Sequence, residues 1–347
     1  MTKVFVIDDS LTVRNGFKTL LSQMDDIELI GTAQNPIDAL DMFSKVGLPD
    51  LFILDIEMPK MDGLTFLKKI NEQRPTPVII CSTLVGKSST VIIDALRLGA
   101  SEVIEKPKNN LNTLFLEYRE ELMEKIYAVT KANINYKNKN KPQNKTKTCS
   151  SEEIHRCQTV SSKIIAIGSS TGGVQVLEEI VTQVKKPHSG IVVVQHIPKQ
   201  FSSSLAHRLN ELSFNSCIKE AENNEMICNN TIYIAPGGIH IEIEKRGLKF
   251  YIVLKDFPKV NAHKPSINVL FNSISKVAKS NALGFILTGM GDDGAKGLKD
   301  MLDSGARTYV QNKKTSTVYG MPSVAWEMGS AIEELSIHEI INMINKN

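Results

Sequence analysis

A serine inside a glycine-rich turn is the first feature of this sequence that suggests covalent chemistry. Ser170 lies in the segment Gly-Ser-Ser-Thr-Gly-Gly (168–173), directly after an apolar run, and the spacing Gly-x-Ser-x-Gly is that of a nucleophile elbow. A serine nucleophile needs a general base, and the base needs a carboxylate to orient it. His196 follows another apolar run, and Asp293 lies in the segment TGMGDDG. These three residues predict acyl transfer.

Other residues compete for each of these roles. His240 and His263 lie near loops that contain glycine or proline and are alternative bases, and Asp292 is an alternative orienting acid. A glycine-rich turn between a strand and a helix also binds phosphate groups, although residues 168–173 match neither the G-x-G-x-x-G pattern nor the ending of a P-loop. The chain order Ser, His, Asp differs from that of α/β-hydrolases, in which the acid precedes the histidine.

A second set of reactive side chains lies in the first third of the chain. Asp8 and Asp9 follow the apolar run VFVI, Asp55 follows LFIL, and Ser82 and Lys106 follow two further short runs. Three carboxylates close together repel one another unless a cation lies among them, and oxygen ligands suit Mg²⁺. We therefore expect a magnesium site beside Asp55. Its carboxylate is a phosphoryl acceptor, with Ser82 and Lys106 stabilising the transferred charge.

Both sets of residues need a scaffold that brings distant segments together. Side chains at the carboxyl ends of parallel strands meet at one edge of the sheet. Residues 1–130 alternate short β-branched runs with helical patterns, which predicts a doubly wound parallel sheet. Its strands are expected at 4–7, 29–31, 51–54, 78–81 and 103–104, and a closing amphipathic helix at 111–130.

A second alternation of the same kind follows and predicts a second doubly wound parallel-sheet domain. Residues 131–160 are rich in Lys, Asn, Ser and Thr with almost no periodic apolar signal, which predicts a flexible linker. We expect α/β domains over 1–130 and 161–347, joined by this linker. The strands of the second domain are expected at 163–167, 190–194, 231–235, 248–253, 282–288 and 306–310, and its helices around 174–184, 202–212, 266–277 and 294–302.

Composition agrees with a two-domain globular protein. The 347 residues are 41% hydrophobic and 23% charged, which excludes a mainly disordered or fibrous chain. The net charge is +3, but residues 131–149 hold six lysines and no acid, so the rest of the chain carries −3. This disfavours a nucleic-acid partner. No signal peptide and no apolar run of ~18 residues is evident, so we expect a cytoplasmic protein without membrane insertion.

The first 130 residues resemble a two-component receiver domain, which has a flavodoxin-like fold. The residues that carry the resemblance are Asp8 and Asp9 in VIDDS, Asp55 in LDIEMPKMDG, Ser82 in IICST and Lys106 in IEKP. The resemblance implies that one of these carboxylates is phosphorylated by a histidine kinase and that the others, with the serine and the lysine, support the reaction.

The receiver resemblance also assigns individual roles. It implies that Asp55 is the phosphoacceptor and that Asp9, Asp55 and the backbone carbonyl of Glu57 bind Mg²⁺. The remaining three residues, Asp8, Ser82 and Lys106, are implied to support the site. Val103 stands where many receivers carry a Tyr or Phe switch residue, so a switch based on an aromatic rotamer is not expected.

From residue 163 onwards the sequence resembles the CheB family of chemotaxis response-regulator protein-glutamate methylesterases. The motifs IAIGSSTGG, VVVQHIP, YIAPGG, HKPSINVLF, ILTGMGDDGAKG and YGMP carry this resemblance, in order. Ser169 stands where the family often has alanine, so mutation has to decide which serine attacks. The roles that the resemblance implies are nucleophile for Ser170, base for His196, orienting acid for Asp293, and oxyanion stabilisation by Thr171 and the backbone N–H of Met290.

The two resemblances together imply a phosphorylation-activated esterase. Its substrates are γ-methyl esters of glutamates on chemoreceptors, its phosphodonor is the chemotaxis histidine kinase, and deamidation of receptor glutamines is a related activity. Mg²⁺ is expected for phosphorylation and no cofactor for ester hydrolysis. A monomer is expected. The alternatives are a signalling adaptor without catalysis, a nucleotide-binding enzyme and, more weakly, a transcription factor.

Overall fold

The computed structural model describes residues 1–82, 88–106, 119–131 and 159–347. The chain forms two compact units, Met1–Lys139 and Asn140–Asn347, and we describe each by itself. The linker predicted over 131–160 lies almost wholly outside the described residues, so its character and the exact domain boundaries stay predictions. Residues 111–118 of the predicted closing helix also lie outside them.

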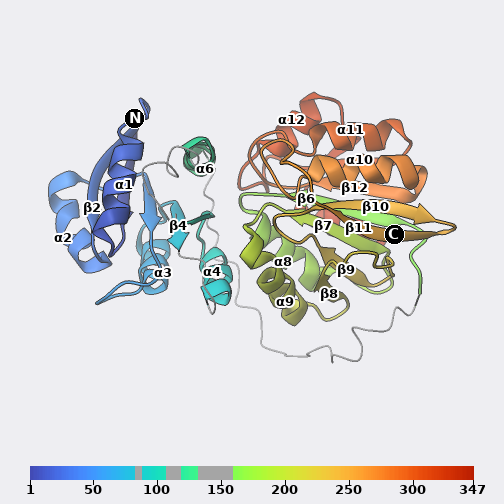
Figure 1. Ribbon diagram of the computed structural model, residues 1–347, viewed down its shortest axis with the longest axis horizontal. Helices are drawn as coiled ribbons and strands as arrows, with labels where there is room; N and C mark the ends of the chain where they lie inside the picture. The colour runs from blue at the N-terminus through green and yellow to red at the C-terminus, as the bar shows by residue number, and fades with distance from the viewer. Residues whose placement is uncertain (83–87, 107–118, 132–158) are drawn as a thin grey trace. The chain divides into compact units, whose positions relative to one another are not determined.

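The first unit is built on a five-stranded sheet in the order β2-β1-β3-β4-β5, in which every pair is parallel (Figure 1). The residues from Val4 to Ile7 are fully buried. Parallel strands covered on both faces need apolar side chains on both, which explains why these runs are continuous rather than alternating. The strands are β1 (Thr2–Ile7), β2 (Ile27–Ala33), β3 (Leu51–Leu54), β4 (Val78–Ser82) and β5 (Glu102–Glu105).

Side-chain caps mark where three helices of the first unit begin. Ser10 accepts a hydrogen bond from the N–H of Val13 in front of α1, and Asn35 and Asp62 cap α2 and α3 in the same way. Such caps satisfy backbone N–H groups that have no partner inside the helix. The helices are α1 (Leu11–Leu21), α2 (Pro36–Val46), α3 (Gly63–Gln73), α4 (Ser88–Arg97) and α6 (Arg119–Lys131).

The second unit is built on a seven-stranded parallel sheet in the order β14-β13-β12-β6-β7-β9-β8. Its central strand β6 pairs with β12 on one side and β7 on the other, and the chain order of the strands reverses there. Sequence analysis missed the short outer strands β8 and β14. The strands are β6 (Ile164–Ser169), β7 (Gly190–Gln195), β8 (Cys217–Glu220), β9 (Thr231–Ile234), β12 (Ala282–Ile286), β13 (Arg307–Gln311) and β14 (Glu333–Leu335).

Helices cover both faces of this sheet, as a doubly wound domain requires (Figure 1). On one face α10 packs against α11 and α11 against α12, and on the other α8 packs against α9 and α13. The four predicted helices are confirmed, whereas α12 and α13 were not predicted. The bounds are α8 (Gly173–Gln183), α9 (Ser202–Leu212), α10 (Ile267–Val277), α11 (Ala295–Asp303), α12 (Met321–Glu327) and α13 (Ile337–Asn345).

One predicted strand does not join the parallel sheet. The segment expected at 248–253 forms β11 (Lys249–Lys255), which pairs antiparallel with β10 (His240–Arg246) in a separate two-stranded sheet. This hairpin packs through β10 against α10. The sequence IEIE at 241–244 has the alternation typical of a half-buried antiparallel strand, so β10 was visible in the pattern but was missed.

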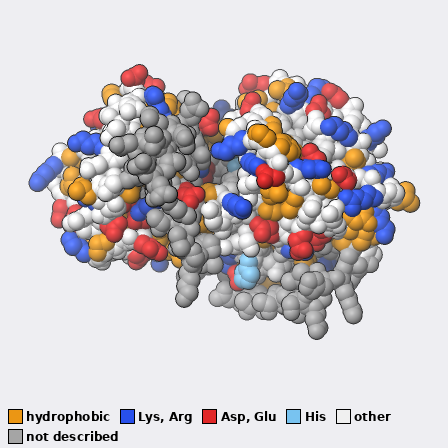
Figure 2. Space-filling model, viewed as in Figure 1, with side chains coloured by type: hydrophobic (Ala, Val, Ile, Leu, Met, Phe, Trp, Pro, Cys, Tyr) orange, Lys and Arg blue, Asp and Glu red, His pale blue; other side chains and the backbone are white. Residues whose placement is uncertain are grey.

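The described surface carries charges of both signs. On the face shown in Figure 2, lysine and arginine side chains are interspersed with aspartate and glutamate on both units. Among the described helices, none combines the length and the apolar character needed to cross a membrane.

Candidate functional sites

The strand order of the second unit brings the three predicted catalytic segments to one edge of the sheet. Ser170 directly follows β6, His196 directly follows β7, and Asp293 lies in the loop after β12. These strands are the central one and its two neighbours, and parallel strands end at the same edge. The point where strand order reverses is where open α/β sheets place their ligands.

Ser170 lies in a tight turn between β6 and α8. Its N–H donates to the carbonyl of Thr288 at 3.0 Å, and its own carbonyl accepts from Gly173 N–H at 2.8 Å. Gly172, in front of α8, has φ of 76°, a conformation that glycine adopts without strain. A Cβ on Gly289 would lie 2.7 Å from Ser170 Cβ, so a side chain at 289 would displace the serine.

Gln195 connects the serine turn to the histidine segment, and sequence analysis missed it. Its side chain, which is 3% exposed, accepts from Ser169 Oγ at 2.6 Å through Oε1 and donates from Nε2 to the carbonyls of Ser170, at 2.9 Å, and His196, at 3.1 Å. The position of Gln195, directly before His196 at the end of an apolar run, was the available signal. The hydroxyl of Ser169 is thus engaged with Gln195.

His196 and Asp293 form a direct hydrogen-bonded pair. The distance between His196 Nε2 and Asp293 Oδ2 is 2.9 Å, and both side chains are buried. Because an ionised carboxylate only accepts hydrogen bonds, Nε2 carries the proton, and the neutral ring then has its lone pair on Nδ1. Nδ1 of His196 is buried and has no hydrogen-bond partner among the described residues. It is available to accept a proton.

Asp293 is held by the N-terminus of α10. Its carboxylate accepts from Ser266 Oγ at 2.7 Å, from Ile267 N–H at 2.7 Å and from Asn268 N–H at 3.1 Å, as well as from His196. Although burial raises the pKa of Asp293, the hydrogen bonds from His196, Ser266 and Ile267 outweigh it and hold this pKa below its usual range. Asp293 therefore remains ionised next to the imidazole.

The competing residues occupy different surroundings. Asp292 is exposed and accepts a hydrogen bond from Asn261, so Asp293 is the acid that contacts His196. The ring of His263 stacks on that of His196, with centroids 3.7 Å apart and 16° between the planes. His240 is fully buried and stacks on Phe257. Neither of these rings replaces His196 as the partner of Asp293 among the described residues.

The predicted oxyanion residues lie beside the serine turn. Thr171 is buried, and its carbonyl accepts from Thr288 Oγ1 at 2.9 Å. Met290 follows Gly289, the residue in close contact with Ser170, and its N–H donates to no group among the described residues. The hydroxyl of Ser170 likewise makes no hydrogen bond to His196 among them, so the structure joins the histidine to the acid but not to the serine.

Three charged groups meet at the carboxyl edge of the five-stranded sheet in the first unit. Lys106 Nζ lies 2.8 Å from Asp8 Oδ2 and 2.6 Å from Asp55 Oδ2, and all three side chains are buried. Asp9 is exposed, and Ser82, at the end of β4, is buried. The sheet order places β1 next to β3, which is why Asp8 and Asp55 lie close together although 47 positions separate them.

Burial governs the protonation of this cluster. It raises the pKa of Asp55 to about 6, against the opposing effect of Lys106, and raises the pKa of Asp8 in the same way. Burial by itself lowers the pKa of Lys106, but the two neighbouring carboxylates outweigh it and raise that pKa above its usual value. The lysine is therefore charged, and the carboxylates keep negative charge in a poorly solvated place.

The carboxylates fit a divalent cation. Asp8, Asp9 and Asp55 each offer an oxygen, and these oxygens all lie within 4.8 Å of one another. Oxygen donors of this kind suit Mg²⁺. The predicted set was Asp9, Asp55 and the carbonyl of Glu57, so the observed cluster adds Asp8 to the two predicted carboxylates.

Comparison with known proteins assigns the chain to a family. Residues 165–344 match the family model described as CheB methylesterase, and residues 4–115 match that of the response regulator receiver domain. The chain belongs to the CheB methylesterase family. A relative from Leptospira interrogans, named protein-glutamate methylesterase/protein-glutamine glutaminase 3, is 43% identical and covers 99% of both chains. A relative of the same name from Shewanella oneidensis is 40% identical, over 99% of this chain and 98% of its own.

A solved structure supports the same assignment for the second unit. The catalytic domain of the Thermotoga maritima CheB methylesterase matches with a TM-score of 0.52 and 36% identity, covering 54% of this chain and 99% of its own. The predicted family and the predicted fold class, a receiver followed by a parallel-sheet esterase domain, are therefore confirmed. The protein is a CheB-family esterase with a receiver domain.

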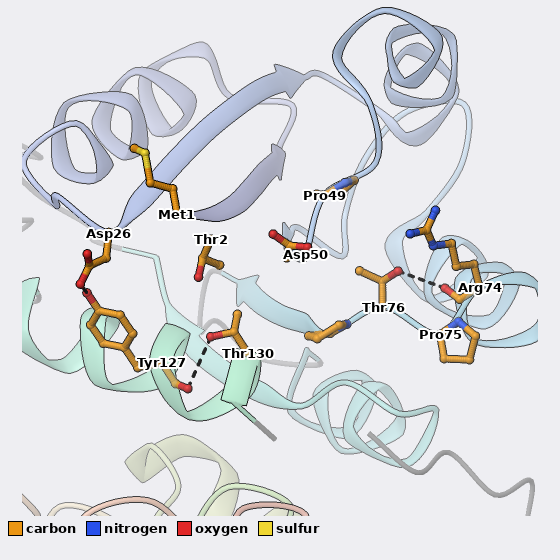
Figure 3. A pocket seen from close by; sticks show the side chains of 11 residues that line it. Met1, Thr2, Asp26, Pro49, Asp50, Arg74, Pro75, Thr76, Tyr127 and Thr130 are labelled. Carbon is orange, nitrogen blue, oxygen red and sulfur yellow. Dashed lines mark hydrogen bonds between the residues drawn. The ribbon is translucent and has the colours of Figure 1, made fainter. Parts of the chain in front are cut away.

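A pocket of about 630 Å³ lies on the receiver unit, and Figure 3 shows the residues that line it. It is lined by residues in front of strands, among them Thr2, Asp26, Asp50 and Thr76. These are the amino ends of β1 to β4, whereas the carboxylates occupy the carboxyl ends. The pocket and the acidic cluster therefore lie at opposite edges of the sheet.

Proposed function

We propose that Ser170, His196 and Asp293 hydrolyse γ-methyl esters of protein glutamates. The observation that carries the proposal is the hydrogen bond between His196 and Asp293. It uses Nε2 of His196, so the buried Nδ1 stays without a partner among the described residues, and His196 follows the strand that pairs with the one before Ser170. The family membership and the names of the relatives support the reaction class.

The first half of the reaction forms an acyl-enzyme. His196 Nδ1 takes the proton of Ser170 Oγ as this oxygen attacks the γ-carbonyl carbon of the substrate. The oxyanion formed accepts hydrogen bonds from Met290 N–H and from Thr171. When the tetrahedral intermediate collapses, the bond to the methoxy oxygen breaks, and His196 returns its proton so that methanol leaves.

The second half regenerates the enzyme. A water molecule attacks the acyl carbon and gives a proton to His196 Nδ1, after which the serine leaves with that proton and a glutamate side chain is released. Asp293 stabilises the imidazolium in both halves, because its charge lies 2.9 Å from Nε2 and is itself fixed by α10.

The receiver domain is the proposed regulator of this reaction. Asp55 Oδ attacks the phosphorus of a phosphohistidine on a histidine kinase, the P–N bond breaks, and an aspartyl phosphate forms. Asp8, Asp9 and Asp55 hold Mg²⁺, which offsets negative charge when bound, and Ser82 and Lys106 contact the transferred group. Phosphorylation raises esterase activity.

The substrates that we propose are methylated chemoreceptors on their cytoplasmic side, so the protein acts in the cytoplasm, as a monomer. Its parts are a receiver over 1–130, a flexible linker over 131–160 and a catalytic domain over 161–347. Because the relatives are also named glutaminases, we include hydrolysis of receptor glutamines. The same acyl-enzyme forms there, with ammonia as the leaving group in place of methanol.

One assay tests both parts of the proposal. Release of labelled methanol from methylated receptor membranes is followed for the wild type, S170A, H196Q and D293N, with and without a small-molecule phosphodonor. We expect each substitution to reduce turnover by about a thousandfold or more, and the phosphodonor to stimulate the wild type but not D55N. Wild-type turnover in a correctly folded S170A would refute the serine mechanism and favour a non-enzymatic adaptor or another nucleophile.

A further inference from the structure

Ser266 occupies the position in front of a helix but does not cap it in the usual way. A serine at this position normally accepts a hydrogen bond from an N–H of the first helical turn. In α10 that task falls to Asp293, whose carboxylate accepts from Ile267 N–H and Asn268 N–H. The hydroxyl of Ser266, fully buried, donates instead to Asp293 Oδ1 at 2.7 Å.

This arrangement gives each oxygen of the carboxylate two donors. Oδ1 receives Ser266 Oγ and Asn268 N–H, and Oδ2 receives Ile267 N–H and the Nε2–H of His196. Four donors from fixed backbone and buried side chains leave the carboxylate a single orientation, and its charge lies at the N-terminus of a helix, where anions are favoured. The orientation of Asp293 in turn sets that of His196.

His240 determines where Ser266 lies. The N–H of Ser266 donates to His240 Nδ1 at 3.2 Å, while His240 Nε2 lies 3.0 Å from the carbonyl of Pro258. Because a carbonyl only accepts, the proton is on Nε2, and Nδ1 is left as the acceptor for Ser266. His240 is fully buried, its ring stacks on Phe257 with centroids 4.2 Å apart, and burial lowers its pKa, which favours this neutral form.

We propose that Ser266 and His240 are positioning residues for catalysis. His240 fixes Ser266, and Ser266 in turn fixes the carboxylate of Asp293. Asp293 then keeps the proton of His196 on Nε2, so that Nδ1 is the nitrogen that faces the nucleophile. The connection runs from β10, at the antiparallel hairpin, through the start of α10 to the catalytic edge of the parallel sheet. This inference rests on the proposed serine mechanism and adds two residues that act through Asp293 without touching the substrate.

The variants are chosen to separate the hydrogen bond from general packing. S266A removes the donor to Asp293, and H240L removes the acceptor for Ser266. H240N keeps an acceptor oxygen near the place of Nδ1 and is the conservative variant. S273A is the matched control, because Ser273 is a buried hydroxyl on the same helix that bridges Ile243 N–H and the carbonyl of Leu270 without contacting Asp293.

Two readouts are measured on the full-length protein. The first is kcat and KM for methanol release from methylated receptor membranes. The second is the ring-nitrogen spectrum of ¹⁵N-histidine-labelled protein, in which the His196 signals are assigned by their loss in H196Q and report which nitrogen carries the proton. The second readout needs no turnover, so it tests the positioning proposal even where the esterase reaction itself fails.

We expect S266A and H240L to lower kcat about tenfold or more at unchanged KM, and to convert His196 from the Nε2–H form to a mixture of tautomers. H240N restores most of the kcat, and S273A keeps the wild-type kcat and tautomer. Wild-type kcat and tautomer in folded S266A would overturn the proposal, and so would an equal loss of kcat in S273A. If S266A fails to fold, the comparison of H240L with H240N decides: equal kcat and tautomer in these two overturns the proposal.

Discussion

The imidazole rings of His196 and His263 lie face to face, with centroids 3.7 Å apart and planes 16° from parallel. Asp293 holds one edge of the His196 ring through Nε2, and His263 covers one of its faces. Because His196 is held at one edge and on one face, its ring cannot turn about the Cβ–Cγ bond without losing both contacts. The stack therefore contributes to the direction in which Nδ1 points.

Replacement of His263 by alanine should lower kcat about twofold to tenfold, because an aromatic pair is worth on the order of 1 kcal/mol and its loss frees the ring of His196, the base that we propose. H263F keeps an aromatic face and should retain most of the activity. Steady-state methanol release on both variants checks this. Equal kcat in H263A and the wild type would show that Asp293 alone orients the ring.

Mutation of the two neighbouring serines should affect different properties, turnover for Ser170 and stability for Ser169. S170A is expected to lose turnover with little change in stability, since the hydrogen bonds described for this residue are made by its backbone N–H and carbonyl. S169A is expected to keep measurable turnover but to lose about 1–3 kcal/mol of unfolding free energy, because Gln195 Oε1 loses its buried donor. Urea unfolding beside methanol release distinguishes the two, and the reverse pattern would make Ser169 the nucleophile.

Gly63 should be essential for phosphorylation of Asp55, the phosphoacceptor that we propose. A Cβ at this position would lie 2.1 Å from the carbonyl oxygen of Asp55 and 2.9 Å from Ile56 Cα, so G63A must displace the backbone that carries the reactive carboxylate. Phosphorylation by a small-molecule donor should be slowed, with basal ester hydrolysis intact. Lys68, exposed on the same helix, provides the control K68A. Normal phosphorylation of G63A would mean that the loop after β3 can shift without impairing phosphorylation.

Acidification should destabilise the catalytic unit through His188. Burial lowers the pKa of this histidine from 6.5, against the hydrogen bond to the carbonyl of Ser189. The unfolded chain therefore binds a proton at His188 more readily than the folded state does. The free energy of unfolding is at its full value above about pH 6.5 and declines as the pH falls below it. The decline is at most about 1.4 kcal/mol per pH unit for one such group.

This dependence is measured by urea unfolding at several pH values. Trp326, the single tryptophan of the chain, lies on α12 and reports on the catalytic unit. H188Q should flatten the decline below about pH 6.5, leaving the part due to His240, whose pKa burial also lowers. An identical pH dependence in H188Q and the wild type would count against this role of His188.

The sequence predicted the strands β3, β6 and β7 well because each is a largely apolar run with a polar residue directly after it. Leu51–Leu54 was predicted residue for residue, and Asp55 follows it directly. The placement of His196 beside Asp293 also followed from strand ends at one edge. These features depend on local pattern and on topology, and both are readable from the chain.

Other features depend on contacts between residues far apart in the chain, which no local pattern contains. Gln195 is an ordinary strand-end residue until Ser169, 26 positions away, is placed against it. In the same way, nothing in the segment HKPS indicates that the Ser266 hydroxyl donates to a carboxylate instead of capping its own helix. The tautomer of His196 likewise follows from which nitrogen meets Asp293, a matter of geometry alone.

The turn of the β10–β11 hairpin is a suitable site for attaching a label. Leu248 is 89% exposed there, and a Cβ on the adjacent Gly247 would meet no atom within 4 Å. The strand from His240 to Arg246 spans about 20 Å, so the tip is remote from the buried end of the hairpin that adjoins α10. A dye or an immobilisation tag attached at position 248 will report on the enzyme, or anchor it to a sensor surface, without crowding its chemistry.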